Sequence, residues 1–228
     1  MALGGNAPFV VFEDADLAAA VEGAMAAKFR NIGEACTAAN RFIVHESLAA
    51  EFTARVSARV AALTVGRGTD DGIEIGPLID EHAVAKASSL VADAVARGAT
   101  VHTGGAVLRG TFFEPTVISG VPAGAEILRQ EIFGPVLAIS TFADEDEAVR
   151  LANDTEYGLV SYVFTRDLAR GHRMIDRLET GMMGLNVGVV SNAAAPFGGV
   201  RQSGLGREGG PEGIHEYLAT KYTLLPND

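Results

Sequence analysis

The sequence contains very little cysteine: Cys36 is the only one among 228 residues, and there is no tryptophan. A single cysteine excludes an internal disulfide. The five histidines are scattered and lack the paired Cys and His spacing that is typical of a metal site. We therefore expect a metal-free protein of a reducing compartment, the cytoplasm. Cys36 is then either a reactive thiol or an ordinary packed side chain.

Positive charge is also scarce, because 18 Lys and Arg residues face 29 Asp and Glu residues, for a net charge of −11. Such a surface argues against nucleic acid or an anionic membrane as a partner. The first residues, MALGGNAPFVV, have no basic segment, and their apolar run is too short to cross a bilayer. We expect neither export nor membrane insertion.

Short apolar runs rich in β-forming residues alternate with alanine-rich stretches of helical period. This order predicts an α/β fold in which helices flank a mostly parallel sheet. Asp14 and Asp16 suit the start of the first helix. Strands are expected at residues 9–12, 42–45, 100–102, 116–118, 136–142, 160–165 and 182–186. Helices are expected at residues 16–29, 47–63, 80–97, 145–152 and 167–179.

The C-terminal part has a different composition. Residues 191–211 are rich in Gly, Ala and Ser, which predicts a loop region. The apolar run Lys221–Leu225 then predicts a terminal β-strand without an obvious partner strand. The stretch Gly204–Gly209 superficially resembles a phosphate-binding glycine loop, but no β-α-β unit surrounds it, so a turn region is the better interpretation.

Taken alone, Cys36 is a weak functional signal, because a cysteine among small residues is most often a packed apolar side chain. Its neighbours, in the run Gly33-Glu34-Ala35-Cys36-Thr37-Ala38, are mostly small. Small neighbours allow a substrate to approach closely and leave backbone N–H groups free to face an oxyanion, as a nucleophile requires. Both interpretations stay open without wider context.

Four segments supply that context. They are Leu3-Gly4-Gly5-Asn6-Ala7-Pro8, Phe29-Arg30-Asn31-x-Gly33-x-x-Cys36, Glu131-Ile132-Phe133-Gly134-Pro135-Val136 and Pro196-Phe197-Gly198-Gly199. In this order and at these spacings they resemble the signature segments of the aldehyde dehydrogenase superfamily. The resemblance runs essentially from end to end, and four segments in register are far more specific than any one of them. It implies the fold of the catalytic, C-terminal domain of that family.

The resemblance also implies covalent catalysis by Cys36. In the family, the thiolate attacks the aldehyde carbonyl to give a thiohemiacetal, hydride passes to the nicotinamide ring, and a water activated by a Glu hydrolyses the thioester. The implied cofactor is NAD or NADP. We expect the full-length enzyme to bind it and this chain alone to bind none.

Ala2 is the sharpest departure from the family pattern. The family segment reads Glu-Leu-Gly-Gly, whereas this sequence reads Ala2-Leu3-Gly4-Gly5 at the corresponding distance from Cys36. Alanine has no titratable group, so it cannot act as the general base. The family's oxyanion-binding Asn belongs to the cofactor-binding half, which we expect this chain to lack. The isolated chain is therefore predicted to be an inactive fragment.

Glu131 and Phe133 match family positions that contact the cofactor. The resemblance implies that the Glu131 carboxylate binds the nicotinamide ribose and that the Phe133 ring packs beside the nicotinamide. Leu3 and Gly4 would lie behind the same ring. The alternative is a solvated Glu and a core Phe, and the functional interpretation depends in part on analogy between folds.

Two further residues point to the substrate. The runs Phe29-Arg30-Asn31 and Gly188-Val189-Val190-Ser191-Asn192 resemble the succinate-semialdehyde branch of the family. Arg30 would bind the far carboxylate of a small aldehyde with two hydrogen bonds, and Ser191 would add another. A surface salt bridge is the alternative for Arg30. Some relatives carry a second Cys two residues after the nucleophile, but Ala38 stands there, so no redox switch is expected.

These interpretations divide the chain into three parts: residues 1–6 end a cofactor-binding domain, residues 7–205 form the catalytic domain, and residues 206–228 form a tail with an oligomerisation strand. We expect a homo-oligomer, because an unpaired strand edge and an uncovered apolar face favour self-association. Two other functions stay open. One is a catalytically silent dimerisation or binding module. The other is a thiol hydrolase that pairs Cys36 with a histidine.

Overall fold

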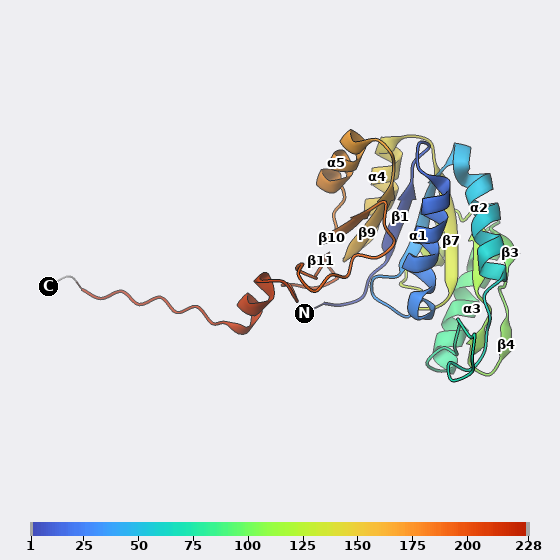
Figure 1. The fold of residues 1–228 in the computed structure, drawn as a ribbon, viewed down its shortest axis with the longest axis horizontal. Coiled ribbons are helices and arrows are strands. Elements are labelled where there is room, and N and C mark those ends of the chain that lie inside the picture. Colours follow the sequence, from blue (N-terminus) through green and yellow to red (C-terminus); the bar gives the residue numbers. More distant parts are fainter. Residues whose placement is uncertain (1, 227–228) are drawn as a thin grey trace.

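The computed structural model describes residues 2–226, and its centre is a seven-stranded sheet in the order β10-β9-β1-β2-β7-β6-β3 (Figure 1). Neighbouring strands are parallel except for β3, which runs antiparallel to β6. The predicted mostly parallel sheet is thereby confirmed. The strands are β1 (Ala7–Val11), β2 (Ala39–His45), β3 (Thr100–Thr103), β6 (Thr116–Ser119), β7 (Val136–Phe142), β9 (Val160–Phe164) and β10 (Met182–Leu185).

Five α-helices connect these strands: α1 (Leu17–Phe29), α2 (Glu46–Ala61), α3 (Glu81–Ala96), α4 (Glu145–Asn153) and α5 (Leu168–Arg177). Asp16, Asp80, Asp144 and Asp167 precede α1, α3, α4 and α5, and each carboxylate accepts a hydrogen bond from a backbone N–H two or three residues later. These aspartates satisfy N–H groups that have no partner within the helix.

Asp14 does not serve α1 as predicted. Its carboxylate accepts hydrogen bonds from Thr165 and from the backbone N–H groups of Arg166 and Asp167. It therefore organises the turn between β9 and α5, which lies beside the end of β1 in the sheet but far from it in the sequence.

The core has two halves, one on each face of the sheet. Phe9 on β1 stacks between Phe42 on β2 and Phe164 on β9, with ring centroids 4.9 Å and 4.8 Å away, on the face that α1 and α2 cover. Val10 and Ile43, which point the other way, join the cluster under α4 and α5. Central strands buried on both faces explain the continuous apolar runs in the sequence.

Several short elements escaped the sequence patterns. Two antiparallel pairs join β4 (Val107–Arg109) to β5 (Phe112–Phe113) and β8 (Tyr157–Gly158) to β11 (Val200–Arg201), and three 3₁₀ helices are η1 (Arg30–Gly33), η2 (Glu126–Leu128) and η3 (Glu212–Tyr217). The β8–β11 pair inserts a strand into the predicted loop region 191–211. Strands of two or three residues and isolated 3₁₀ turns carry too little periodicity to be detected.

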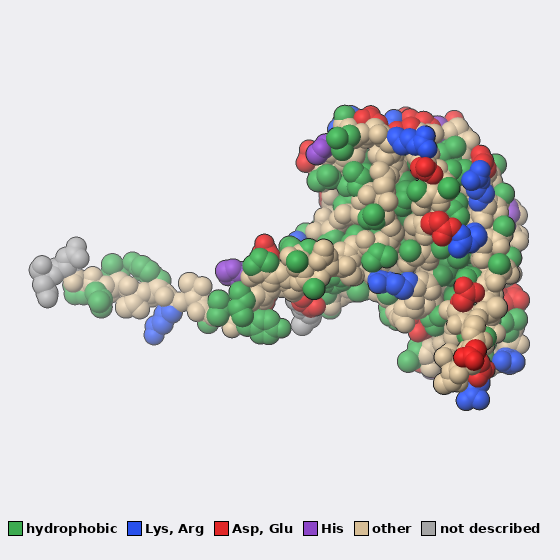
Figure 2. All heavy atoms as spheres, in the orientation of Figure 1, with side chains coloured by type: hydrophobic (Ala, Val, Ile, Leu, Met, Phe, Trp, Pro, Cys, Tyr) green, Lys and Arg blue, Asp and Glu red, His purple; other side chains and the backbone are tan. Residues whose placement is uncertain are grey.

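The predicted terminal strand Lys221–Leu225 is wrong for this chain by itself. Residues 221–226 have no regular secondary structure and project away from the body of the molecule (Figure 1). Tyr222, Leu224 and Leu225 are 82%, 78% and 74% exposed, and Figure 2 shows apolar side chains along this segment. A strand needs a partner backbone, and residues 2–226 offer none here. None of the described helices is long and apolar enough to span a membrane.

Candidate active site

The candidate site lies at the amino edge of the sheet, where the parallel strands β1, β2 and β7 begin. Gly4 and Gly5 precede β1, Cys36 precedes β2 and Glu131 precedes β7. Parallel strands begin at the same edge, so the topology brings these three segments together. Open parallel sheets usually bind ligands at the opposite, carboxyl edge, so fold class alone did not predict this location.

A sharp turn presents Cys36. Asn31 and Ile32 in η1 have φ of 52°, a conformation that is uncommon for residues other than glycine. Gly33 has φ of 80°, and a Cβ there would lie 2.4 Å from the Gly134 carbonyl oxygen. Only glycine fits this close approach. The turn leaves Cys36 half-buried at the surface rather than packed in the core.

The Gly4-Gly5 pair lies directly against Cys36 and Glu131. A Cβ on Gly5 would lie 2.2 Å from the Cys36 carbonyl oxygen, and a Cβ on Gly4 would lie 3.0 Å from Glu131 Oε2. The Gly5 N–H donates to Glu131 Oε1 at 2.9 Å. The structure thus brings together three of the segments that the sequence singled out, and it leaves no room for a side chain at Gly5, whereas a Cβ on Gly4 would require Glu131 to shift slightly.

Burial raises the pKa of the Cys36 thiol above its usual 9.0, and the charges of Glu131 and Glu208 raise it further. The backbone N–H groups of Cys36 and Thr37 lower it, because they donate toward the sulfur and favour the thiolate. The thiol of this chain is therefore mostly protonated at neutral pH.

Glu131 and Phe133 both present groups that a ligand could contact, and their cofactor role stays a prediction. Within residues 2–226, Glu131 Oε1 has the Gly5 N–H as its partner, and Oε2 has no hydrogen-bond partner, so Oε2 is free to accept a ribose hydroxyl. Phe133 has φ of 53°, and 38% of its surface is exposed. An exposed ring held by a strained backbone is not the core Phe of the alternative interpretation.

Arg30 and Tyr162 belong to the same neighbourhood as Cys36. The Tyr162 hydroxyl donates to the Thr37 carbonyl oxygen at 2.9 Å. Burial raises the pKa of Tyr162 to about 12, while the charge of Arg30 lowers it and that of Cys36 raises it. Arg30 itself is exposed and, within the described residues, has no salt-bridge partner. The surface salt bridge that was its alternative role is not formed among residues 2–226.

Ser191 lies in the long loop after β10 and is exposed. The preceding residues are anchored, since Val190 packs against the core and the backbone of Gly188 touches that of Gly23 in α1. Ser191 makes no hydrogen bond to Arg30 in the part of the chain that the structure describes. The role of Arg30 and Ser191 in binding the substrate stays a prediction.

Ser203, which the sequence did not single out, holds the segment that precedes β1. Its buried hydroxyl donates to the Gly4 carbonyl oxygen at 2.8 Å and accepts from the Gly158 N–H at 3.0 Å. The Leu3 N–H donates to the Ser203 carbonyl oxygen, and Ala2 bridges to Gly204. The glycine-rich C-terminal region thus holds the N-terminal segment in place.

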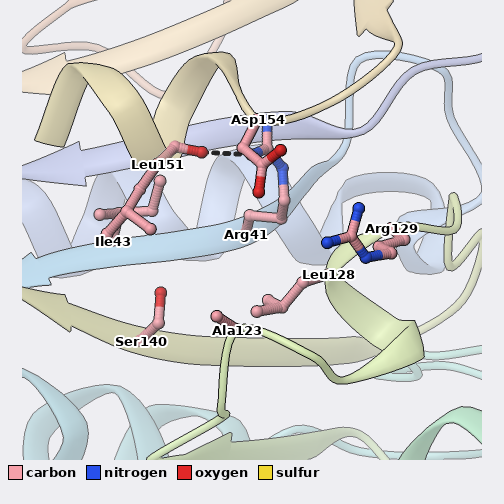
Figure 3. Close-up of a pocket in the computed structure, with 8 residues that line it drawn as sticks. All are labelled: Arg41, Ile43, Ala123, Leu128, Arg129, Ser140, Leu151 and Asp154. Atoms are coloured by element: carbon pink, nitrogen blue, oxygen red, sulfur yellow. Dashed lines mark hydrogen bonds between the residues drawn. The ribbon is translucent and has the colours of Figure 1, made fainter. Parts of the chain in front are cut away.

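Arg41 is a second residue that the sequence patterns missed. Its guanidinium donates to the carbonyl oxygens of Asn6, Leu151 and Ala152 at 2.8–2.9 Å, and burial lowers its pKa to about 10. Figure 3 shows the pocket beside it and the hydrogen bond to Leu151. Arg41 ties the residue after Gly5 to the end of α4. The signal available was a polar pair, Asn40-Arg41, at the start of an otherwise apolar strand.

The histidines give no support to a thiol hydrolase. His45 contacts Ser47 and the Ala143 carbonyl oxygen at the far edge of the sheet, and His102 contacts Ser119. Among the described residues, no histidine hydrogen-bonds Cys36 or is a cause of its pKa shift. The described residues also contain no cluster of potential metal ligands.

Comparison with known proteins adds independent information. The family model described as "Aldehyde dehydrogenase family" matches residues 1–223. The chain is 59% identical to a succinate-semialdehyde dehydrogenase of Paenarthrobacter nicotinovorans over 97% of its own length and 50% of that protein. It is 51% identical to a glutarate-semialdehyde dehydrogenase of Pseudomonas aeruginosa, over 98% of this chain and 47% of the relative.

Solved structures agree. A succinate-semialdehyde dehydrogenase from Burkholderia pseudomallei superposes with a TM-score of 0.94 at 53% identity, over 95% of this chain and 45% of that one. A betaine aldehyde dehydrogenase from Staphylococcus aureus in complex with NAD+ has a TM-score of 0.91 at 38% identity, over 96% and 45% of the two chains. This chain therefore spans about half the length of the relatives that it matches.

Proposed function

We propose a function from one premise: this chain belongs to the aldehyde dehydrogenase family, whose model it matches over residues 1–223. The chain supplies the cysteine-bearing half of an NAD(P)-dependent enzyme that oxidises an aldehyde to a carboxylate. The observation that carries the proposal is the meeting of Cys36, the Gly4-Gly5 pair and the Glu131 carboxylate at the amino edge of the sheet. Such an edge holds a half-buried thiol beside a carboxylate oxygen that is free to bind a ligand.

In the proposed reaction, Cys36 Sγ bonds to the aldehyde carbon, the carbonyl π bond breaks, and the thiol proton ends on the carbonyl oxygen, which yields a thiohemiacetal. The N–H groups of Cys36 and Thr37 favour the thiolate that starts this step. When bound, NAD or NADP would supply the hydride acceptor, with Glu131 on its ribose and Phe133, Leu3 and Gly4 beside its nicotinamide. The thioester on Cys36 is then hydrolysed, which releases the carboxylate and restores the thiol.

The hydrolytic step needs a general base that position 2 does not provide. Ala2 occupies the family's Glu position, and in this chain it pairs with Gly204. We propose that the chain alone does not turn over, because water attack on the thioester lacks a proton acceptor at this position.

We propose a semialdehyde with a terminal carboxylate, such as succinate or glutarate semialdehyde, as the substrate. The names of the relatives support this class. So does Arg30, an exposed cation near Tyr162 and Cys36 that has no carboxylate partner among the described residues. Ser191 would add a hydrogen bond to the same carboxylate.

The test joins this chain to the part of the Paenarthrobacter relative that precedes the matching region, with Glu in place of Ala2. We expect aldehyde-dependent formation of NAD(P)H, none from the bare chain, and far slower turnover when Ala2 is kept. A joined enzyme that folds, binds NAD(P) and still oxidises no aldehyde would contradict the proposal. Ester hydrolysis by the bare chain that depended on a histidine would favour the thiol hydrolase.

The substrate class has its own test in the joined enzyme. Arg30→Gln should raise the KM for succinate semialdehyde at least about tenfold and leave the KM for butyraldehyde, which lacks the carboxylate, nearly unchanged. Arg67→Gln, at another exposed arginine, is the matched control. An equal effect on both aldehydes would remove Arg30 from substrate recognition.

We also propose that the chain self-associates through its exposed apolar tail, residues 218–226. Tyr222, Leu224 and Leu225 are 74–82% exposed, and in a dimer the backbone of this segment would pair with a strand of the second copy. Sedimentation of the chain with and without residues 218–228 tests this. A monomer at micromolar concentration with the tail present would contradict it.

A further inference from the structure

Lys28 is a fully buried lysine in the core, where packing alone would be served by an apolar side chain. It lies near the end of α1, its surface is fully buried, and its Nζ donates to Asn40 Oδ1 at 2.9 Å. Within residues 2–226 this is its one hydrogen bond, although an ammonium has three donors. Burial lowers the pKa of Lys28 to about 7, and the Glu131 carboxylate opposes that shift. An apolar side chain would fill the same space without the free-energy cost of burying a charged group.

The hydrogen bond between Lys28 and Asn40 joins the two elements on either side of Cys36. Lys28 belongs to α1 and Asn40 to β2, so the bond closes a loop whose residues, 29–39, include η1 and Cys36. The strained backbone at Asn31 and Ile32 belongs to the same loop. A single buried side-chain contact therefore links the two ends of the segment that presents the thiol.

The charge of Glu131 acts on Lys28, and the backbone of Lys28 lies close to Gly33 in the same loop. The Lys28 carbonyl oxygen would be 3.1 Å from a Cβ on Gly33, on the side where the Gly134 carbonyl would be 2.4 Å away. Other charged or titratable groups in or around the loop include Glu34, whose carboxylate accepts a hydrogen bond from the Ile79 N–H, and Arg30, Glu131, Glu208 and Tyr162.

We propose that Lys28 is a positioning residue: its hydrogen bond to Asn40 holds the 29–39 loop so that Cys36 stays half-buried against Glu131. The inference rests on the proposed function for its meaning, since a fixed sulfur position matters only if Cys36 attacks a substrate. Near-attack geometry is sensitive to displacements of about 1 Å.

The experiment follows the pH dependence of Cys36 alkylation by iodoacetamide, which reads this residue alone because the chain has no other cysteine. Four variants are compared: Lys28→Met, Asn40→Leu, the double variant of both, and Asn40→Asp, which keeps an acceptor oxygen. Replacing both partners of a buried hydrogen bond by apolar groups restores most of the stability that either single change removes. The double variant thereby separates stability from positioning.

We expect the double variant to have close to native thermal stability and yet to react at least about threefold faster near pH 8. Its alkylation midpoint should move down toward 9.0, because a released loop exposes the thiol and relieves the burial that raises its pKa. Asn40→Asp should stay within about twofold of the native rate. Thr53→Val, which changes another buried polar residue away from the site, should leave the profile unchanged.

A folded double variant with the native alkylation profile would overturn the proposal, because Lys28 would then serve the fold alone. If the double variant does not fold, the two Asn40 variants decide. A native profile in Asn40→Leu overturns the proposal, and faster alkylation in Asn40→Leu but not in Asn40→Asp supports it. None of these measurements uses an aldehyde or NAD(P), so failure of the joined enzyme to oxidise aldehydes would contradict the proposed function and leave this result standing.

Discussion

The two edges of the central sheet are built in opposite ways. At the amino edge, backbone segments approach so closely that only glycine fits, a half-buried thiol faces outward, and Glu131 keeps one carboxylate oxygen unpaired within residues 2–226. At the carboxyl edge, charged side chains bind one another. Glu145 accepts two hydrogen bonds from Arg173 at 2.7–2.8 Å and one from Arg177 at 3.2 Å.

Arg170 extends this network at the carboxyl edge. It pairs with Glu13 at 2.7 Å and with Asp14 at 2.9 Å, and its guanidinium lies 4.5 Å from the centre of the Phe12 ring. Figure 2 shows acidic and basic side chains gathered along this edge of the molecule. The carboxyl edge therefore satisfies its charges internally and contributes stability, while the amino edge keeps reactive groups available for a ligand.

The largest expected effect separates chemistry from stability at the amino edge. In the joined enzyme, Cys36→Ala should lower kcat by at least about a thousandfold, because no other group can form the thioester. The unfolding free energy should change by less than about 1 kcal/mol, since the side chain is only half-buried. Substantial residual turnover in Cys36→Ala would mean that the nucleophile is elsewhere.

The second prediction concerns the close approach of Gly5 to the Cys36 carbonyl oxygen and its effect on stability. Gly5→Ala places a Cβ 2.2 Å from the Cys36 carbonyl oxygen, so the loop must move, at a cost of about 1–3 kcal/mol, and the alkylation rate of Cys36 should change with it. Gly68→Ala is the control, because a Cβ there meets nothing within 4 Å. Urea unfolding of both variants checks the difference, and equal stability of the two would show that the approach is looser than described.

The carboxyl edge should respond to pH instead. The hydrogen bond from Arg173 lowers the pKa of Glu145 below 4.5 even though burial opposes it. The native state therefore gains stability from the ionised carboxylate above that pH and loses it as the pH falls through the lower folded value. Glu145→Gln should cost about 1–2 kcal/mol at pH 7, and the cost should shrink below about pH 4.5, without any change in Cys36 alkylation. A cost independent of pH would contradict the ionic origin.

The smallest effect concerns the charge beside the thiol. Glu131→Gln keeps an oxygen to accept the Gly5 N–H but removes the charge that raises the Cys36 pKa. The midpoint of alkylation should fall and remain above the value of an exposed thiol, because burial persists. Glu81→Gln, at the start of α3, should have no effect. A higher midpoint in Glu131→Gln would mean that the Glu131 charge lowers the pKa of Cys36 instead of raising it.

Much of the fold was predictable from the sequence because its signals are local. Alternating apolar runs and helical periods located the strands of the main sheet and its five helices, and aspartates such as Asp80 and Asp144 mark helix starts through contacts within three residues. The four family-like segments likewise named Cys36 and Glu131 before any geometry was known. The division of the chain at residues 6 and 205 stays a prediction.

Contacts between distant segments were decided only by the tertiary structure. Gly5 and Glu131 are 126 residues apart, and Gly4 and Ser203 are 199 apart, so no pattern in the sequence announces that they meet. The burial of Lys28 and the unpaired state of the terminal segment also depend on what surrounds them. Helical period and capping depend on neighbours along the chain, whereas a hydrogen bond across the sheet depends on strand order, which only packing of the whole chain determines.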